Sequence, residues 1–112
     1  MAAVIAKERM FTFEAGQTTA RNVVILKRAT TVTIAFDFNH KLDSGLTIST
    51  APITQVDSNG ALTIGASDIR NEEVSAAISG WVTEKRYRLR CTANMSDSSI
   101  IIVEGWVEVI TV

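Results

Sequence analysis

The sequence predicts an all-β protein whose strands pack as two sheets in a β-sandwich. Apolar and polar residues alternate with a period of two along most of the chain, as they do on strands with one buried face. β-branched and aromatic residues crowd these runs, and turn-forming residues recur about every 8–12 residues. The result is about seven or eight short strands, which is typical of a sandwich of this size.

Composition indicates one folded domain. The chain has 112 residues, of which 46% are hydrophobic and 21% charged, so it is neither disordered nor long enough for two ordinary domains. Its formal net charge is −1, which gives no basic excess to neutralise phosphates, and we expect no nucleic-acid partner. The apolar run before Lys7 is too short for a signal peptide or a membrane span. We therefore expect a protein made and folded in a cytoplasm, with no membrane partner.

Residues 1–20 are the least periodic part of the chain. We expect an N-terminal arm or an extra strand there, followed by a single domain over residues 21–112. Phe11 and Phe13 share a face with one polar residue between them, a pattern suited to adding a strand to the exposed edge of another chain. The alternative is an ordinary first strand on the domain's own sheet.

Two segments near the start of the domain predict strands. Residues 21–26, RNVVIL, end in four consecutive apolar residues and suit a strand buried on both faces. Residues 30–38 contain the clearest alternation in the chain. The residues expected on the buried face of this second strand are Val32, Ile34, Phe36 and Phe38.

The next strands are shorter and are delimited by turn residues. Residues 45–50 and 53–56 predict two strands with a boundary at Pro52, because proline cannot donate to a sheet ladder. Asn59-Gly60 favours the positive φ angles of a tight hairpin turn. Residues 67–79 could begin a helix capped by Ser67, but the alternation of their second half favours a strand.

The last two strands form a hairpin that turns at residues 95–99. Alternation places one set of residues toward the core: Tyr87, Leu89, Cys91, Val103, Val107 and Val109. Tyr87, at the head of its strand, is positioned to pin a corner of the sandwich. The outer face carries Arg86, Arg88 and Arg90 opposite Glu104 and Glu108. Such pairs contribute a few tenths to about one kcal/mol each and disfavour a slipped register.

The two tryptophans are the candidates for a specific role. Trp81 follows Gly80 between two strands, where it would cap one end of the core. Trp106 lies on the charged outer face, where it either stacks on the stem of Arg88 or Arg90 or anchors an interface. The candidate interface residues are Phe11, Phe13, Trp81, Arg88, Glu104 and Trp106.

We find no catalytic or metal-binding arrangement in the sequence. His40 is the only histidine and lies in a polar segment that suits a solvated turn. Alternation buries Cys91, and Asp37 lies among apolar residues, where it is either a perturbed acid or, more commonly, a turn cap. Residues 57–60, DSNG, lack the further oxygen ligands of a calcium loop. We expect no catalytic residue, no cofactor and no metal.

Several stretches together resemble a family of small tailed-phage virion proteins, the fibre-to-tail adaptors. FDFNHKL at 36–42 is similar to that family's aromatic-Asp-aromatic opening, polar turn and leucine. LTISTAPIT at 46–54 and GALTIGAS at 60–67 are similar to its next strands. The stretch VSAAISGWVTEKRYRLRCTANMSDSSIIIVEGWVEV at 74–109 is similar to its closing pattern of strand, Ser-Gly link, Tyr-led strand, turn and final strand. The resemblance covers roughly residues 34–110.

The chain departs from this family's usual pattern in three places. Phe38 stands where tryptophan is common, Trp81 stands where small residues are usual, and the first thirty residues differ from a short proline-rich start. The resemblance implies an immunoglobulin-like β-sandwich and a virion location.

The resemblance further implies a non-enzymatic structural protein that joins tail and fibre or other appendages. The expected partners are other virion proteins and copies of the chain itself. The alternatives are a capsid decoration or joining protein and a carbohydrate-binding module, and two tryptophans on one exposed face would favour the latter.

Overall fold

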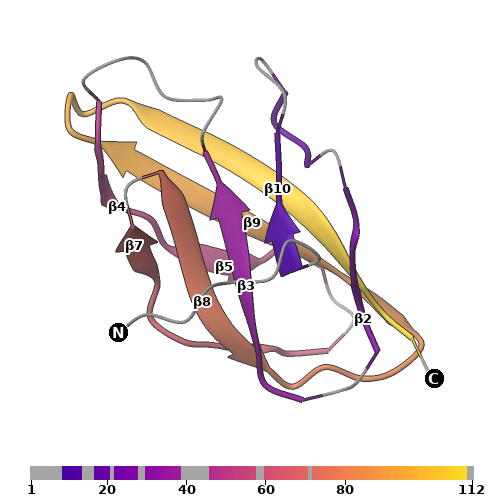
Figure 1. The fold of residues 1–112 in the computed structure, drawn as a ribbon. Coiled ribbons are helices and arrows are strands. Elements are labelled where there is room, and N and C mark those ends of the chain that lie inside the picture. Colours follow the sequence, from indigo (N-terminus) through magenta and orange to yellow (C-terminus); the bar gives the residue numbers. More distant parts are fainter. Residues whose placement is uncertain are drawn as a thin grey trace.

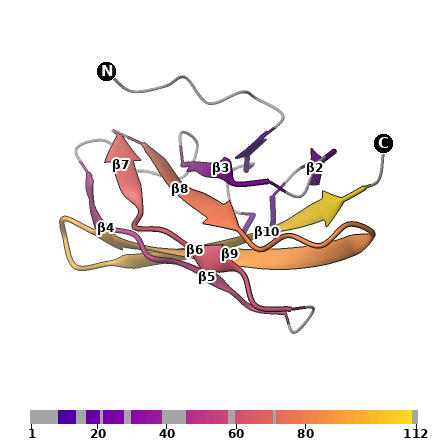
Figure 2. The same cartoon turned by 90° about the horizontal axis from the view of Figure 1, so that it is seen from below.

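A computed structural model describes residues 9–13, 17–20, 22–27, 30–38, 46–57, 60–70 and 72–110. Two sheets of five strands each pack face to face (Figures 1 and 2). The first sheet contains β1 (Met10–Phe11), β3 (Val32–Asp37), β8 (Glu73–Ser79) and β6 (Thr63–Ile64) in that order, with β7 (Asp68–Arg70) also paired to β8. The second contains β2 (Val24–Leu26), β10 (Ile100–Val109), β9 (Lys85–Met95) and β4 (Ile48–Thr50) in that order, with β5 (Ile53–Gln55) also paired to β9. The β-sandwich prediction is confirmed.

The ten strands occupy eight positions, which agrees with the predicted count. β4 and β5 both pair with β9 on either side of Ala51-Pro52, and β6 and β7 both pair with β8. Counted by position, the strand order of the two sheets is that of immunoglobulin-like sandwiches. The parallel pairing of β1 with β3 departs from the antiparallel meander expected of neighbouring strands.

The central strands follow their alternation. Val32, Ile34, Phe36 and Phe38 are buried, as predicted, and β3 pairs antiparallel with β8 along its whole length. Residues 67–79 form two strands and no helix, with Val74, Ala76 and Ile78 buried on one side of β8. Pro52 separates β4 from β5, and its carbonyl accepts a hydrogen bond from the Thr92 amide at 3.0 Å.

The expected hairpin at Asn59-Gly60 is wrong. β5 and β6 belong to different sheets, so the chain crosses between the sheets there and does not turn back along β5. Gly60 does have a positive φ of 118°, while Asn59 lies outside the described residues. The Gln55 side chain supports the crossing, since it donates to the Gly60 carbonyl and accepts from the Leu62 amide. The Asn59-Gly60 dipeptide predicted a turn at this point, but it did not predict which strand β6 would pair with.

The strand in residues 21–26 is not buried on both faces. Val24 and Leu26 are buried, whereas Val23 and Ile25 are 41% and 48% exposed. The reason is that a two-layer sandwich covers only the inner face of each sheet, so alternate residues of β2 point away from the core. In this protein the apolar run therefore forms an edge strand with one buried face.

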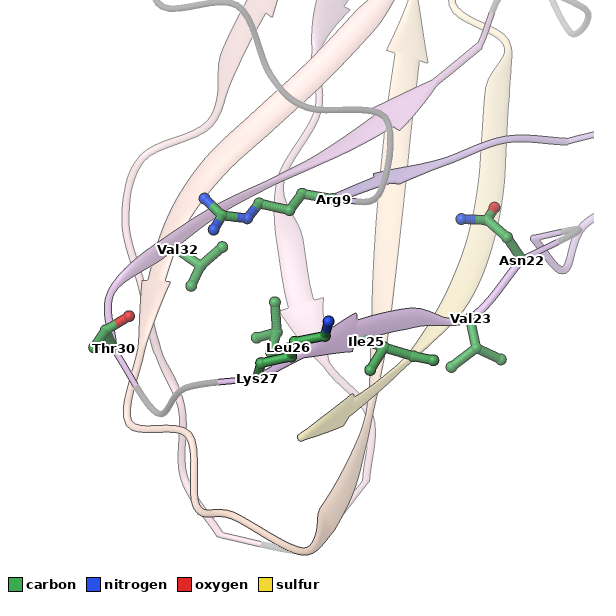
Figure 3. Close-up of a pocket in the computed structure, with 8 residues that line it drawn as sticks. All are labelled: Arg9, Asn22, Val23, Ile25, Leu26, Lys27, Thr30 and Val32. Atoms are coloured by element: carbon green, nitrogen blue, oxygen red, sulfur yellow. The ribbon is translucent and has the colours of Figure 1, made fainter. Parts of the chain in front are cut away.

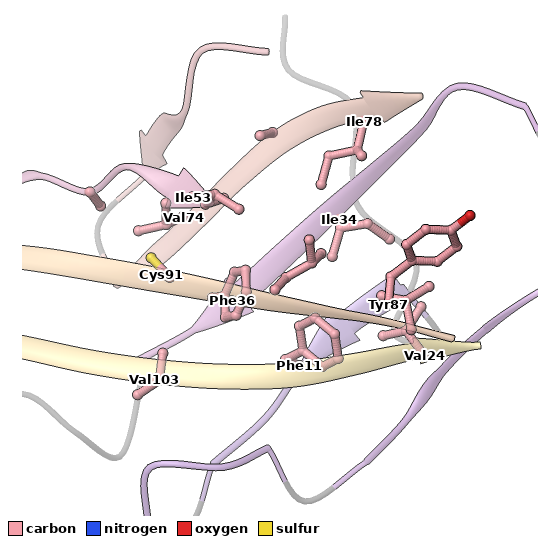
Figure 4. Packing of buried hydrophobic residues seen from close by; sticks show 14 of the residues in the cluster. Phe11, Val24, Ile34, Phe36, Ile53, Val74, Ile78, Tyr87, Cys91 and Val103 are labelled. Carbon is pink, nitrogen blue, oxygen red and sulfur yellow. The ribbon is translucent and has the colours of Figure 1, made fainter. Parts of the chain in front are cut away.

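The N-terminal segment belongs to the sandwich in its described part. The Phe11 and Phe36 ring centroids are 5.0 Å apart, and the Phe13 ring stacks at 6.3 Å on Phe36 and on Phe38 (Figure 4 shows Phe11 beside Phe36). Phe11 and Phe13 are 0% and 1% exposed. The arm prediction is therefore wrong for these two residues, and the extra-strand alternative describes Met10–Phe11.

Further contacts extend this conclusion toward residue 20. Thr19 forms a parallel bridge with Glu104. The Glu104 amide donates to the Thr18 carbonyl, and the Glu104 carbonyl accepts from the Ala20 amide. The Asn22 side chain accepts from the Thr12 amide and donates to the Met10 carbonyl. A domain boundary at residue 20 is thus misplaced, because residues on both sides of it hydrogen-bond to the same two sheets.

Gly105 explains how Phe11 reaches the centre of the core. It lies on the inward face of β10 between Val103 and Val107, and a Cβ added there would approach the Phe11 ring to 2.5 Å. The Cγ atom of the ring is also within 2.8 Å of that position, so the ring cannot escape by a small rotation of its far end. The Phe11 ring fills the space that a side chain at position 105 would occupy.

We predict that Gly105→Ala lowers the free energy of unfolding by about 1–3 kcal/mol, because the added methyl group overpacks the core. Phe11→Ala should cost about 3–5 kcal/mol by leaving a cavity. In the double variant the two costs should not add, since the ring that the methyl group strikes is gone. Urea unfolding of the wild type and the three variants measures this, and additive costs would contradict the contact.

Candidate functional site

The outer face of the β9–β10 hairpin has the predicted register. Arg90 lies opposite Glu104, Arg88 opposite Trp106 and Arg86 opposite Glu108. We call the surface formed by Arg86, Arg88, Arg90, Glu104, Trp106 and Glu108 the Arg–Trp face. Thr54 of β5 lies beside Arg90 on the other edge of β9.

A short turn fixes this register. The Met95 amide donates to the Ser99 carbonyl at 2.9 Å, and the Ser98 amide donates to the Met95 carbonyl at 3.0 Å. Ser98 adopts a positive φ of 71°. The Asp97 carboxylate accepts hydrogen bonds from the Ser99 hydroxyl and amide, which lower the pKa of Asp97.

The inner face of the same hairpin secures it to the core. The six residues predicted to point inward are all fully buried: Tyr87, Leu89, Cys91, Val103, Val107 and Val109. The Tyr87 hydroxyl accepts a hydrogen bond from the Val82 amide at 3.0 Å, which ties the corner before β9 to the strand itself. This confirms the predicted role of Tyr87 and resembles the tyrosine corner of immunoglobulin-like sandwiches.

Glu104 is the centre of the charge arrangement. Its Oε2 atom lies 2.6 Å from Arg90 Nη2 and accepts from Arg90 Nε at 2.8 Å, while its Oε1 atom pairs with Arg88 Nη2. The Glu104 side chain is only 14% exposed, whereas those of Arg88 and Arg90 are 41% and 43% exposed. The carboxylate is therefore shielded beneath two guanidinium groups that reach the solvent.

The pair at the other end of the face is weaker. Arg86 Nε lies 4.0 Å from Glu108 Oε2, and both side chains are about half exposed. Exposed pairs at this distance contribute little because water screens them and both side chains lose rotamer freedom. The face thus has one tight ion cluster at Glu104 and one loose pair at Glu108.

Trp106 lies among the arginines. The Arg86 and Arg88 guanidinium carbons are 5.0 and 5.5 Å from the centroid of its ring, within the range of cation–π contacts. Stacking on Arg88 was predicted; stacking on Arg90 was wrong, because Arg90 is held by Glu104. Arg86 and Arg90 are both diagonal neighbours of Trp106 across the ladder, and Arg86 is the second partner because Arg90 pairs with Glu104. The indole is half-buried and held in place by its neighbours.

The backbone beneath Arg88 is also fixed from outside the hairpin. The Asp57 carboxylate, just after β5, accepts from the Arg88 amide at 2.6 Å. Its other oxygen accepts from the Gln55 side chain at 2.9 Å. The Arg–Trp face is consequently built on a strand that is anchored by β5 as well as by β10.

Three of the predicted interface residues are not on the surface. Phe11, Phe13 and Trp81 are at most 4% exposed, so in the folded chain they cannot contact a partner. Trp81 caps the end of the core, as predicted. Its Nε1 donates to the Ile78 carbonyl at 3.0 Å, and its ring meets the Tyr87 ring edge-on with centroids 5.3 Å apart. The structure brings together only Arg88, Glu104 and Trp106.

Exposed aliphatic residues near this face were missed. Ile102 lies on the same side of β10 as Trp106 and is 46% exposed, so alternation alone could have identified it. Val23 and Ile25 lie beside Trp106 and Glu108 because β2 runs parallel to β10. No sequence signal indicated that pairing.

The structure places two of the residues that the sequence raised as possible reactive groups, Cys91 and Asp37. Cys91 is fully buried, and desolvation raises the pKa of its thiol to about 12, so it is no nucleophile near neutral pH. Asp37 ends β3 opposite Glu73 and is half-buried. Within the described ranges no three His, Cys, Asp or Glu side chains gather as metal ligands, and His40 lies outside them. A helix long and apolar enough to cross a membrane is likewise not found in those ranges.

Comparison with known proteins gives one match. The model of a family described as "Podophage GP4 fiber-tail adaptor protein gp77" matches residues 27–107. This region runs from just after β2 nearly to the end of β10 and includes every residue of the Arg–Trp face except Glu108. No curated protein gives a significant match to the chain.

We predict that Glu104→Lys lowers the free energy of unfolding by about 1–3 kcal/mol, since it places three cations together on a partly shielded surface. Adding Arg90→Glu should restore part of the loss, but not all of it, because Arg88 still faces the new lysine. A double-mutant cycle measures the coupling. The matched control is Glu108→Lys with Arg86→Glu, where the coupling should stay below about 0.5 kcal/mol. Equal coupling in both cycles would contradict the tight cluster at Glu104.

We also predict that Cys91 of the native chain reacts slowly with a thiol reagent near neutral pH, because the thiol is both inaccessible and protonated. Denaturant should release the reaction, and the unfolded chain serves as its own positive control because it contains a single cysteine. Rapid labelling before unfolding would show that β9 presents its other face to the core.

Proposed function

Because this chain belongs to the podophage fiber-tail adaptor family, we propose that it joins tail and fibre components by protein–protein contacts made through its Arg–Trp face. The family gives it a structural role in the phage tail, a place in the virion and other virion proteins as partners. The proposal adds which surface makes the contact and how.

The observation that carries the proposal is the position of Trp106. Its ring is held between Arg86 and Arg88 and is only half-buried. Tryptophan and arginine are the residues that most often dominate binding energy in protein interfaces. A side chain already fixed in one orientation loses little further conformational entropy when a partner covers it.

The charges on the face favour an acidic partner surface. The arginines expose their guanidinium groups, while the Glu104 carboxylate beneath them is shielded. A partner carboxylate would therefore meet cations first. Complementary charges of this kind mainly set orientation and partner choice, and the apolar contact with Trp106 would supply most of the affinity.

We propose further that the role is non-enzymatic and that assembly occurs in the cytoplasm of the host bacterium. Self-association between copies in the particle is part of the proposal, while contacts with nucleic acid and membranes are not. The formal net charge of −1 supports the exclusion of nucleic acid, because the chain has no basic excess to neutralise phosphates.

The sugar-binding alternative lacks its expected platform. It required two tryptophans on one exposed face, but Trp81 is buried at the end of the core. A capsid decoration role has no support from the family description, which names the junction of fibre and tail.

We predict that Trp106→Ala leaves the isolated chain folded, with a loss of about 1–2 kcal/mol for the two cation–π contacts. Incorporation into particles should fall by about tenfold or more when the variant replaces the natural protein during phage growth. Virion content is measured on purified particles, and folding by circular dichroism.

The matched control is Val82→Ala, which removes an aliphatic side chain that is 46% exposed at a corner away from the Arg–Trp face. It should be incorporated normally. Normal incorporation of a well-folded Trp106→Ala variant would overturn the proposal and leave Trp106 as a residue that rests on arginine stems.

A further inference from the structure

A groove lies along one side of the sandwich. It has a volume of about 480 Å³ and runs between β2 and the start of β3, with Asn22 at one end and the Arg9 side chain extending toward Val32 (Figure 3). Its apolar lining comes mainly from Ile25, Leu26 and Val32. We call it the edge groove. None of Arg88, Glu104 or Trp106 lines it, although Ile25 of its lining pairs with Glu108 at the margin of the Arg–Trp face.

Two strand edges border the edge groove without a neighbour. β2 is the last strand of its sheet and pairs only with β10. β1 covers only Ala35 and Phe36 of β3, so within the described residues Val32–Ile34 have a paired strand on the β8 side alone. In an extended strand, alternate residues turn their backbone N–H and C=O groups to opposite sides. Both edges therefore present hydrogen-bonding groups to an added strand.

The fold closes the comparable edge of β1 with a side chain. The Asn22 amide donates to the Met10 carbonyl at 2.9 Å and accepts from the Thr12 amide at 3.0 Å, so one side chain imitates a pairing strand. In the part of the chain that the structure describes, no side chain covers the free edge of β2 or of the first half of β3 in this way. The lack of a covering side chain is thus a feature of the strand edges at the groove and not of the β1 edge.

The side chains along the open edge are of the kind that proteins usually avoid there. Edge strands of soluble proteins are commonly protected by charged residues, proline or bulges, because an exposed apolar edge adds strands from other chains. β2 instead exposes Val23 and Ile25 by 41% and 48%. Among the described residues that line the groove, the charged ones are Arg9 and Lys27, and none is acidic.

From these observations we propose that the edge groove binds an extended segment of another virion protein, which adds a strand to the free edge of β2. The segment would alternate aliphatic side chains, which cover Ile25 and Leu26, with at least one carboxylate that meets Arg9 or Lys27. Main-chain hydrogen bonds supply affinity in this mode of binding, and the side-chain pockets supply specificity. The chain would then hold two partners at once, one on the Arg–Trp face and one on its flank.

The test uses the full chain labelled with ¹⁵N and a short synthetic peptide in which valine alternates with glutamate and threonine. We expect saturable amide shifts in residues 22–27 and 30–34, and little change on the Arg–Trp face. Ile25→Lys should weaken binding by about tenfold or more, because a lysine on an edge strand opposes strand addition. Ile100→Lys is the matched control, since Ile100 is 59% exposed at the opposite end of β10, and it should bind as the wild type does.

A charge exchange tests the second half of the proposal. A peptide with lysine in place of glutamate should bind the wild type about tenfold more weakly. The double variant Arg9→Glu with Lys27→Glu should reverse that preference. These measurements require no virion, so their outcome is independent of the Trp106→Ala experiment.

Three results would overturn the proposal. One is the absence of shifts along β2 and β3 at millimolar peptide, and another is equal binding by Ile25→Lys and the wild type. The third is a concentration-dependent dimer of the peptide-free chain that Ile25→Lys abolishes, because the occupant would then be β2 of a second copy.

Discussion

The pairing of β9 with β10 is the interaction on which the rest of the structure depends. It places six buried side chains on the inner face and the Arg–Trp face on the outer one. A slip of either strand by one residue would exchange the faces and bring arginines into the core. Burying an unpaired charge costs several kcal/mol, whereas each outer ion pair contributes a few tenths to about one. Core burial therefore sets the register, and the charge pairs refine it.

The same hairpin also determines where the N-terminal segment can go. Gly105 leaves a gap on the inner face of β10, and the Phe11 ring fills it. That contact draws β1 across to pair with β3, while Thr18 and Ala20 hydrogen-bond to the backbone of Glu104 on the other sheet. The segment thus bridges both sheets. The sandwich is held closed on this side by two phenyl rings rather than by a continuous first strand.

β1 closes this side of the sandwich only in part, and the uncovered part matters for assembly. A full-length first strand would cover the edge of β3 and part of the edge groove, but β1 pairs with only two residues. Within the described residues, the chain therefore has an outer face with a fixed aromatic side chain and a flank where two strand edges lack a paired neighbour. An adaptor needs to hold two different neighbours, and surfaces of unlike chemistry keep those neighbours from competing for one site.

The sequence by itself determined the sandwich, most strand positions and both faces of the last hairpin, because a period of two is a local property that any strand with one buried face must show. It also determined the burial of Cys91 and the corner role of Tyr87. Only the tertiary structure decided which strands are neighbours: that β6 joins the sheet opposite β5, that β2 is an edge, and that Phe11 lies over Gly105. These pairings join residues far apart in the chain, and local patterns carry no information about which distant strand supplies the partner. The same limit explains why Trp81 and the two phenylalanines were assigned to an interface. Local sequence does not distinguish an aromatic residue that packs in the chain's own core from one that a partner protein would cover.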